Sequence, residues 1–163
     1  MIVNGKAVIG IDPGLSGAIC LLDGLNRVTI WDMPTVEVLR GRKTKRELDL
    51  TALSTIIFGI TDEAVAYVEQ VGAMPGQGVS SMFSFGKSYG GTLGILAALQ
   101  VPVQEHVPPQ RWQKALNVRK GKDGSRLRAS ELLPSYMSLW ARVKDDGRAE
   151  AALIAYYGMH ARA

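Results

Sequence analysis

The sequence predicts an α/β protein in which helices cover the faces of one sheet. Three short strand-like runs come first, a helical segment follows, and strand–helix pairs complete the chain. This order is typical of a layered α/β structure. No linker, internal repeat or low-complexity tract divides the 163 residues. We therefore expect a single domain over residues 1–163.

Three strands are expected in the first part of the chain. Residues 6–12 form a nearly continuous apolar run, as in a strand buried on both faces, and Asp12-Pro-Gly ends it. Residues 17–23 and 27–33 are the next two strand-like runs, separated by a tight turn at Gly24 and Asn26. The basic stretch after Pro34 is expected to be an exposed loop.

The second part of the chain predicts alternating helices and strands. A helix capped by Asp49 comes first, followed by a strand at 64–70 and an irregular segment at 72–78. Next come a long helix capped by Ser80 or Ser81, a strand at 101–107, and a helix that is opened by Pro108 and Pro109 and carries Trp112. A short helix ending near Pro134 and a last helix from about Asp146 to His160 complete the chain. We interpret Trp112 as a core residue rather than a base-stacking one.

The net charge of +4 is modest, but the cations fall in two clusters. The candidate DNA-binding residues are Arg40, Arg42, Lys43, Lys45 and Arg46 in the first cluster, and Arg111, Lys114, Arg119, Lys120, Lys122, Arg126 and Arg128 in the second. Such clusters can neutralise phosphates, which makes nucleic acid a reasonable partner. Two solvated loops are the alternative, and charge alone does not separate the two interpretations.

No apolar run approaches the ~20 residues that a membrane-spanning helix needs. The first residues, MIVNGKAVIGID, run directly into strand-like sequence without the features of a secretory leader. We therefore expect a cytoplasmic protein with no membrane partner. Cys20 is the only cysteine, which excludes an intramolecular disulfide and a cysteine-built zinc site.

The positions of four acidic residues are the most informative feature. Asp12 and Glu69 each end an apolar strand, and side chains beyond the strand ends of an α/β sheet can converge. Asp146 and Glu150 stand four residues apart in the last helix and therefore share a face. Asp145 is the alternative to Asp146, but five residues before Glu150 it should point away from it.

Four carboxylates gathered without counter-ions would repel one another and raise one another's pKa. A divalent cation relieves this repulsion, and hard oxygen ligands suit Mg²⁺ or Mn²⁺. Taken singly, each acid has a simpler explanation, for example a turn before Pro13 for Asp12 or a favourable charge at a helix N-terminus for Asp146. The combination predicts a metal site.

Three segments, IGIDPGLSGAI, YVEQ and KDDGRAEAALIAYYG, resemble the RuvC-like Holliday junction resolvases of the ribonuclease-H-like superfamily. The resemblance runs over nearly the whole chain, with the segments in family order. It implies a ribonuclease-H-like five-stranded mixed sheet flanked by helices. The continuation VGAMPGQGVSSMFSFG and the final DDGRAEAAL look more like bacteriophage or prophage versions, which would place the protein in a bacterial host cytoplasm.

The resemblance also implies a reaction. Asp12, Glu69, Asp146 and Glu150 match the acids that hold two Mg²⁺ ions per site, with Mn²⁺ able to substitute. Lys122 resembles a basic residue near the scissile phosphate, and Lys120 close by is the alternative. The implied products of paired nicks in a four-way junction carry 5′-phosphate and 3′-hydroxyl ends. The family is dimeric, and the long helix with Met82, Phe83, Phe85 and Tyr89 is the candidate interface, with ordinary core packing as the alternative.

Three rival functions follow from the same residues. A sugar-kinase-like or actin-like phosphotransferase shares the opening D-x-G pattern, but it needs a second domain and a nucleotide cofactor, which we do not expect here. A broader nuclease for forks and flaps would use the same acids. A catalytically silent junction-binding module is disfavoured because all four acids are present.

Overall fold

The computed structural model describes residues 7–60 and 63–160. Its main sheet has five strands, as predicted, and their order is β3-β2-β1-β6-β7. These strands are β1 (Ala7–Asp12), β2 (Ala18–Leu22), β3 (Val28–Asp32), β6 (Ala64–Glu69) and β7 (Val103–Val107). The first three pair antiparallel, whereas β6 is parallel to both β1 and β7, so the sheet is mixed.

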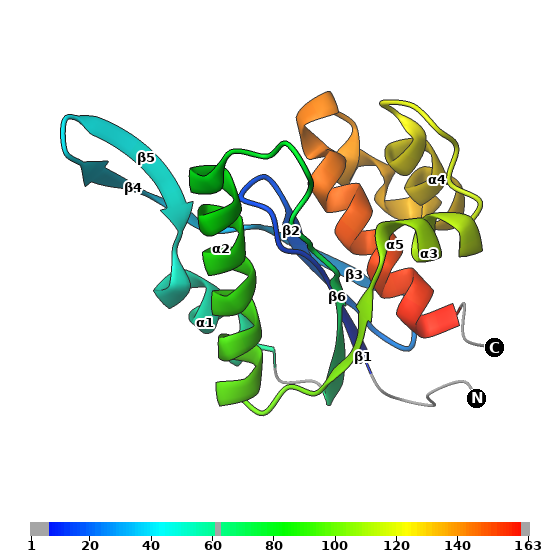
Figure 1. Cartoon of the computed structure of the whole chain (residues 1–163). Helices are drawn as coiled ribbons and strands as arrows, with labels where there is room; N and C mark the ends of the chain where they lie inside the picture. Colours follow the sequence, from blue (N-terminus) through cyan, green and yellow to red (C-terminus); the bar gives the residue numbers. More distant parts are fainter. Residues whose placement is uncertain (1–6, 61–62, 161–163) are drawn as a thin grey trace.

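Helices cover both faces of this sheet (Figure 1). On one face lie α1 (Leu50–Phe58) and α2 (Val79–Ala98), and on the other lies α5 (Asp146–His160), backed by α3 (Pro109–Ala115), α4 (Gly124–Leu132) and two 3₁₀ helices, η1 (Pro134–Trp140) and η2 (Val143–Asp145). No helix among residues 7–60 and 63–160 is long and apolar enough to cross a membrane.

The central strand β1 is buried on both sides, as its apolar run predicts. Ile9 and Ile11 belong to the cluster that packs under α1 and α2, with Leu53 and Leu96. Val8 belongs to the second cluster, which packs under α5 and contains the fully buried Trp112 and Trp140. Successive side chains therefore serve opposite faces, and the strand is fixed between the two helical layers.

The basic stretch is not a loop, contrary to the sequence-based expectation. It forms most of a β-hairpin, β4 (Thr35–Arg40) and β5 (Lys43–Leu48), which projects from the body (Figure 1). Arg40 pairs with Lys43 in the ladder, so Gly41 and Arg42 form a two-residue turn, and Gly41 supplies the positive φ of 64° that such a turn needs. The high charge of the hairpin hid its strands, because neither of them lies in the core.

Most predicted helix ends are confirmed. Asp49 caps α1 by accepting a hydrogen bond from the Ala52 backbone N at 2.9 Å, and Pro109 is the first residue of α3. The last helix begins at Asp146, as expected. The cap of α2 was predicted wrongly: the helix begins at Val79 after Gly78, and no serine side chain caps it. Ser80 and Ser81 lie inside its first turn instead.

Candidate metal centre and nucleic-acid interface

Asp12 and Glu69 lie next to each other at one edge of the sheet. The parallel ladder pairs Ile11 of β1 with Val68 of β6, so the next residues of the two strands, Asp12 and Glu69, lie side by side. Both side chains are half-buried. The strand-end placement inferred from the sequence therefore holds for these two carboxylates.

Helix α5 reaches this edge because glycines remove the side chains between it and the sheet. A Cβ on Gly10 of β1 would lie 2.3 Å from the Ala151 carbonyl oxygen, and a Cβ on Gly147 would lie 2.3 Å from the Ser16 carbonyl oxygen. Backbone therefore packs against backbone. Sequence reasoning missed this contact, although Gly147, Ala151 and Ala155 recur every fourth residue as a face of small side chains.

Glu150 joins the two strand acids electrostatically. Burial raises the pKa of Asp12 to about 6, against a lowering by the Gly14 backbone hydrogen bond. Burial and then the charges of Asp12 and Glu150 raise the pKa of Glu69 to about 7, against a lowering by the Trp112 hydrogen bond. The pKa of Glu150 is raised to about 7 by burial and then by the charge of Asp12. Ionising all three carboxylates together at this edge is therefore unfavourable.

Among the described residues, each of these three acids has a single protein donor on one oxygen. The Trp112 indole Nε1 donates to Glu69 Oε1 at 3.0 Å, and Ser125 Oγ donates to Glu150 Oε1 at 3.2 Å. The Gly14 backbone N donates to Asp12 Oδ1 at 3.2 Å. The core placement of Trp112 is confirmed, but its hydrogen bond to Glu69 was not foreseen. These donors orient the carboxylates and leave their second oxygens for another ligand.

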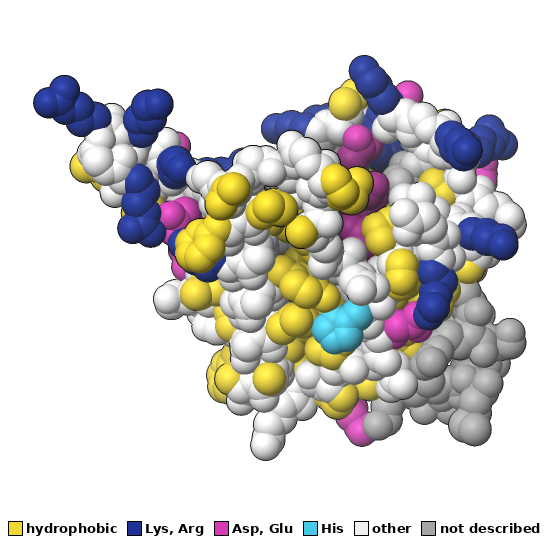
Figure 2. Space-filling view, viewed as in Figure 1, with side chains coloured by type: hydrophobic (Ala, Val, Ile, Leu, Met, Phe, Trp, Pro, Cys, Tyr) yellow, Lys and Arg dark blue, Asp and Glu magenta, His cyan; other side chains and the backbone are white. Residues whose placement is uncertain are grey.

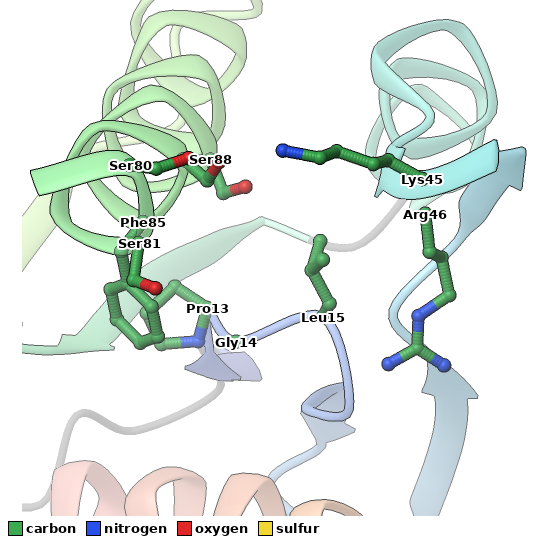
Figure 3. Close-up of a pocket in the computed structure, with 10 residues that line it drawn as sticks. Pro13, Gly14, Leu15, Lys45, Arg46, Ser80, Ser81, Phe85 and Ser88 are labelled. Atoms are coloured by element: carbon green, nitrogen blue, oxygen red, sulfur yellow. The ribbon is translucent and has the colours of Figure 1, made fainter. Parts of the chain in front are cut away.

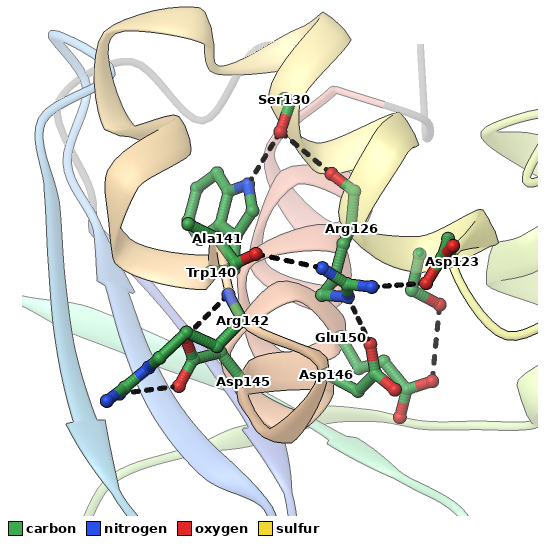
Figure 4. Close-up of polar contacts among 10 residues, drawn as sticks. Asp123, Arg126, Ser130, Trp140, Ala141, Arg142, Asp145, Asp146 and Glu150 are labelled. Carbon is green, nitrogen blue, oxygen red and sulfur yellow. Dashed lines mark hydrogen bonds and ion pairs between the residues drawn. The ribbon is translucent and has the colours of Figure 1, made fainter.

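Asp146 is held differently (Figure 4). Arg126 of α4 donates from Nε to Asp146 Oδ1 at 2.8 Å, from Nη1 to the Ala141 carbonyl oxygen at 3.1 Å, and from Nη2 to Asp123. Arg126 was predicted to contact DNA, yet this side chain is largely buried among protein partners. Its guanidinium balances the Asp146 charge beside the other acids.

Asp145 is excluded from the acidic edge by its own ion pair. Its carboxylate is buried and accepts hydrogen bonds from Arg142 Nε at 3.0 Å and Nη2 at 2.9 Å. The hydrogen bonds from Arg142 hold the pKa of Asp145 below its usual range. This geometry supports the choice of Asp146 over Asp145 as the acid that accompanies Glu150.

The donor set suits a divalent cation in the kind of ligand it offers. Asp12, Glu69 and Glu150 are hard oxygen donors whose mutual repulsion a cation would remove. Within the described parts of the chain, however, no three acidic, histidine or cysteine side chains are close enough together to hold one ion.

The cations of the hairpin and of the α3–α4 region flank the acidic edge. Figure 2 shows acidic side chains between two groups of Lys and Arg side chains, one on the projecting hairpin and one on the opposite lobe. Lys120 and Lys122 are exposed in the loop before α4. Among the described residues, neither they nor Lys114, Arg42, Lys43 and Lys45 pair with a carboxylate.

Other predicted DNA contacts already have protein partners. Arg111 pairs with Glu105 at 2.6 Å, and Arg128 pairs with Glu131 at 2.7 Å. Arg40 pairs with Glu47 at 3.0 Å and Arg119 with Glu131 at 3.7 Å. Arg46 donates to Ser16 Oγ at 2.9 Å. Only part of each basic cluster is therefore available to an incoming phosphate.

Comparison with known proteins places this arrangement in a structural class. No family model matches the chain. The computed structure aligns with Thermus thermophilus RuvC in complex with a Holliday junction substrate at a TM-score of 0.59, with 16% identity, over 94% of each chain. The chain has the RuvC fold. A second Thermus thermophilus RuvC structure gives a TM-score of 0.53 with 16% identity, over 94% of this chain and 96% of that one.

A sequence relative points the same way as the RuvC fold. The chain is 28% identical over 156 residues to the chloroplastic Holliday junction resolvase MOC1 of Chlamydomonas reinhardtii. This match covers 83% of the chain but only 18% of that longer protein. The resemblance to RuvC-like proteins predicted from the sequence, and the ribonuclease-H-like sheet it implied, are both confirmed.

Proposed function

We propose that this protein is a metal-dependent, structure-selective endonuclease that resolves four-way DNA junctions by paired symmetric nicks. The observation that carries the proposal is the meeting of Asp12, Glu69 and Glu150 at one edge of a RuvC fold. Unpaired cations flank this edge on two sides, which suits a polyanion laid across it. Two similar proteins add support: the RuvC structure is a complex with a Holliday junction substrate, and MOC1 is a Holliday junction resolvase.

Asp12, Glu69, Asp146 and Glu150 would hold two Mg²⁺ ions, with Mn²⁺ as a substitute. When bound, such a pair supplies a hydroxide nucleophile and stabilises the departing 3′ oxygen. The chain contributes the rest. Trp112 and Ser125 orient two of the carboxylates. Lys122, with Lys120 as the alternative, approaches the cut phosphate from the loop before α4. The products would carry 5′-phosphate and 3′-hydroxyl ends.

A homodimer would supply the two matched nicks, because a four-way junction has approximate two-fold symmetry. Helix α2 offers a face for it: Gly86, Gly90 and Gly94 recur every fourth residue, and a Cβ on any of them would meet nothing within 4 Å. Phe83 is 73% exposed beside them. Tyr89 shares a hydrogen bond with His106 at 2.8 Å and packs in part against the core, which supports the core-packing alternative for this residue.

The phage-type origin and the location in a bacterial host cytoplasm expected from the sequence belong to this proposal. So does the single-domain organisation over residues 1–163. Two rival functions remain to be separated by experiment: a nuclease for forks and flaps, and a silent junction-binding module. Both would use the same acidic edge and the same flanking cations.

Cleavage of defined substrates tests the proposed function. End-labelled four-way junction, forked and linear duplex DNA are incubated with Mg²⁺ or with chelator. We expect paired, symmetric, metal-dependent nicks in the junction. Asp12→Asn should abolish cleavage and retain junction binding, whereas Asp23→Asn, at the opposite edge of the sheet, should cut normally. Equal cutting of forks would indicate the broader nuclease, and tight binding without any cutting would indicate the silent module.

The oligomeric state tests the α2 interface separately. Gly90→Arg should fold, because arginine is a better helix former than glycine, but it should leave only monomer in light scattering at micromolar concentration. Junction products should then become single nicks. Phe58→Arg, on the exposed end of α1, is the matched control and should remain dimeric. A wild-type protein that is monomeric under these conditions would overturn the dimer proposal.

A further inference from the structure

A pocket of about 340 Å³ opens beside the acidic edge (Figure 3), and Phe85 is the one candidate interface residue that lines it. Its walls come from three segments: the loop that follows Asp12, strand β5 of the hairpin, and the first turns of α2. Pro13 is part of the wall and is the next residue after Asp12. Whatever binds here therefore lies next to the carboxylate edge.

The wall combines apolar surface with hydroxyls. Pro13, Leu15 and Phe85 supply the apolar part, and the Phe85 ring lies beside Pro13 (Figure 3). Four serines of α2 contribute hydroxyl groups, namely Ser80, Ser81, Ser84 and Ser88. A flat aromatic molecule with polar edges fits such a lining, because the ring faces can stack while the hydroxyls donate to or accept from the edge.

The remaining wall residues carry positive charge. Lys45 extends from β5 toward α2 across the pocket (Figure 3), and no carboxylate in the described part of the chain pairs with it. Arg46 lies at the same wall, where it donates to Ser16. The lining contains no acidic side chain, which disfavours a cationic ligand. The pocket therefore combines an apolar surface on which an aromatic ring can stack with a positively charged surface that can bind an anionic group.

We propose that this pocket binds one unstacked nucleotide of the strand that is cut. Its base would lie against Phe85 with its edge on the serine hydroxyls, and its flanking phosphate would contact Lys45 and Arg46. The volume lies within the range of roughly 300–1,000 Å³ usual for small-ligand pockets. Because the base edge meets hydroxyl groups, the pocket would give the cleavage reaction a sequence preference. This inference rests on the proposed nuclease function.

Photocross-linking tests where the base lies. A series of four-way junctions is prepared, each with 5-iodouracil at one position within three nucleotides of the cut. Each junction is bound to the protein in chelator and irradiated. We expect one position to cross-link to the α2 peptide that contains Phe85. Ser84→Leu, which fills the pocket, and Phe85→Leu, which removes the ring, should abolish that cross-link. Ser138→Leu and Phe58→Leu change exposed residues outside the pocket and should retain it.

Cleavage of junctions with varied sequence provides the second measurement. With Mg²⁺, Ser84→Leu should lower the rate ratio between preferred and disfavoured sequences by about tenfold, and Ser138→Leu should not. Junction cutting with no cross-link to α2 and an unchanged sequence ratio in Ser84→Leu would overturn the pocket assignment alone. A wild-type protein that cross-links through Phe85 but cuts no junction would instead overturn the proposed function and retain the pocket.

Discussion

The two sides of the acidic edge are built in opposite ways. On the α5 side, backbone packs against backbone at Gly10 and Gly147, and nearby cations such as Arg126 are bound to carboxylates. On the hairpin side, Lys43 and Lys45 are exposed without a described carboxylate partner. The first side holds the acids in place, and the second side exposes cations to solvent. Each basic cluster in the sequence therefore mixes cations bound to carboxylates, such as Arg40 and Arg126, with cations that have no described carboxylate partner.

The largest effect is expected from disturbing the fixed side. Gly147→Ala places a Cβ where the Ser16 carbonyl oxygen lies, so α5 must move away from the sheet. We expect a loss of about 1–3 kcal/mol in unfolding free energy, as for other overpacked sites. Displacement of Glu150 should reduce cleavage by on the order of 10²-fold.

Thermal unfolding and single-turnover cleavage measure these two quantities. Gly78→Ala is the control, because a Cβ there meets only an ordinary contact with Ser81 Oγ at 3.9 Å. If Gly147→Ala unfolds and cuts like the wild type, the close approach of α5 is not what positions the acids, and the contrast between the two sides fails.

A smaller effect is expected from neutralising the exposed side. The double change Arg42→Gln and Lys43→Gln removes two unpaired charges from the hairpin turn. We expect junction affinity to fall, and the slope of log affinity against log salt to decrease by roughly 0.9 for each phosphate that is no longer neutralised. Fluorescence anisotropy across a salt series in chelator measures both quantities without cleavage.

Arg128→Gln sharpens the same comparison from the other basic cluster. Arg128 donates to Glu131 and to the Leu116 carbonyl oxygen, so its removal should lower stability while the salt slope stays nearly unchanged. The comparison would be wrong if Arg128→Gln changed the salt slope more than the hairpin variant did.

A separate effect concerns pH in the absence of metal. The folded-state pKa values of Asp12, Glu69 and Glu150 are raised to about 6, 7 and 7, so folding favours their protonated forms. Their favourable contribution is complete near pH 4 and is lost as pH rises through 6 to 7. Stability in chelator should therefore fall between about pH 4 and pH 7, by on the order of 2 kcal/mol for one group.

Denaturant unfolding at several pH values measures this slope. Asp12→Asn removes one of the three charges, so its stability should depend less on pH than that of the wild type, while Asp23→Asn should keep the full dependence. Added Mg²⁺ should restore stability at high pH. Stability that rises steadily from about pH 4 to pH 7 in chelator would contradict the electrostatic description of the site.

The strand-end acids were predictable because strand boundaries determine where such residues lie. Asp12 and Glu69 each follow an apolar run, and parallel neighbours end at the same edge. The spacing of Asp146 and Glu150 similarly placed them on one helix face. The core strands themselves were predictable for a related reason, since continuous burial leaves a continuous apolar pattern in the sequence.

Features that depend on contacts distant in sequence were not predictable in this way. The hairpin strands lack a buried face, so no apolar alternation marked them. Arg126 and Trp112 reach Asp146 and Glu69 only after α4 and α3 pack against α5. Which arginines face solvent is likewise decided by carboxylates elsewhere, as for Arg111 and Glu105. A charge in the sequence does not reveal its partner.

The hydrogen bond between Trp112 and Glu69 has a spectroscopic consequence. The indole is fully buried and touches one carboxylate of the acidic edge directly, so its emission senses the charge on that carboxylate. The chain has three tryptophans, and replacing Trp31 and Trp140 with phenylalanine would leave this single fluorophore. Titrating such a protein with Mg²⁺ or acid would let occupancy of the site be followed optically, in solution and without any DNA.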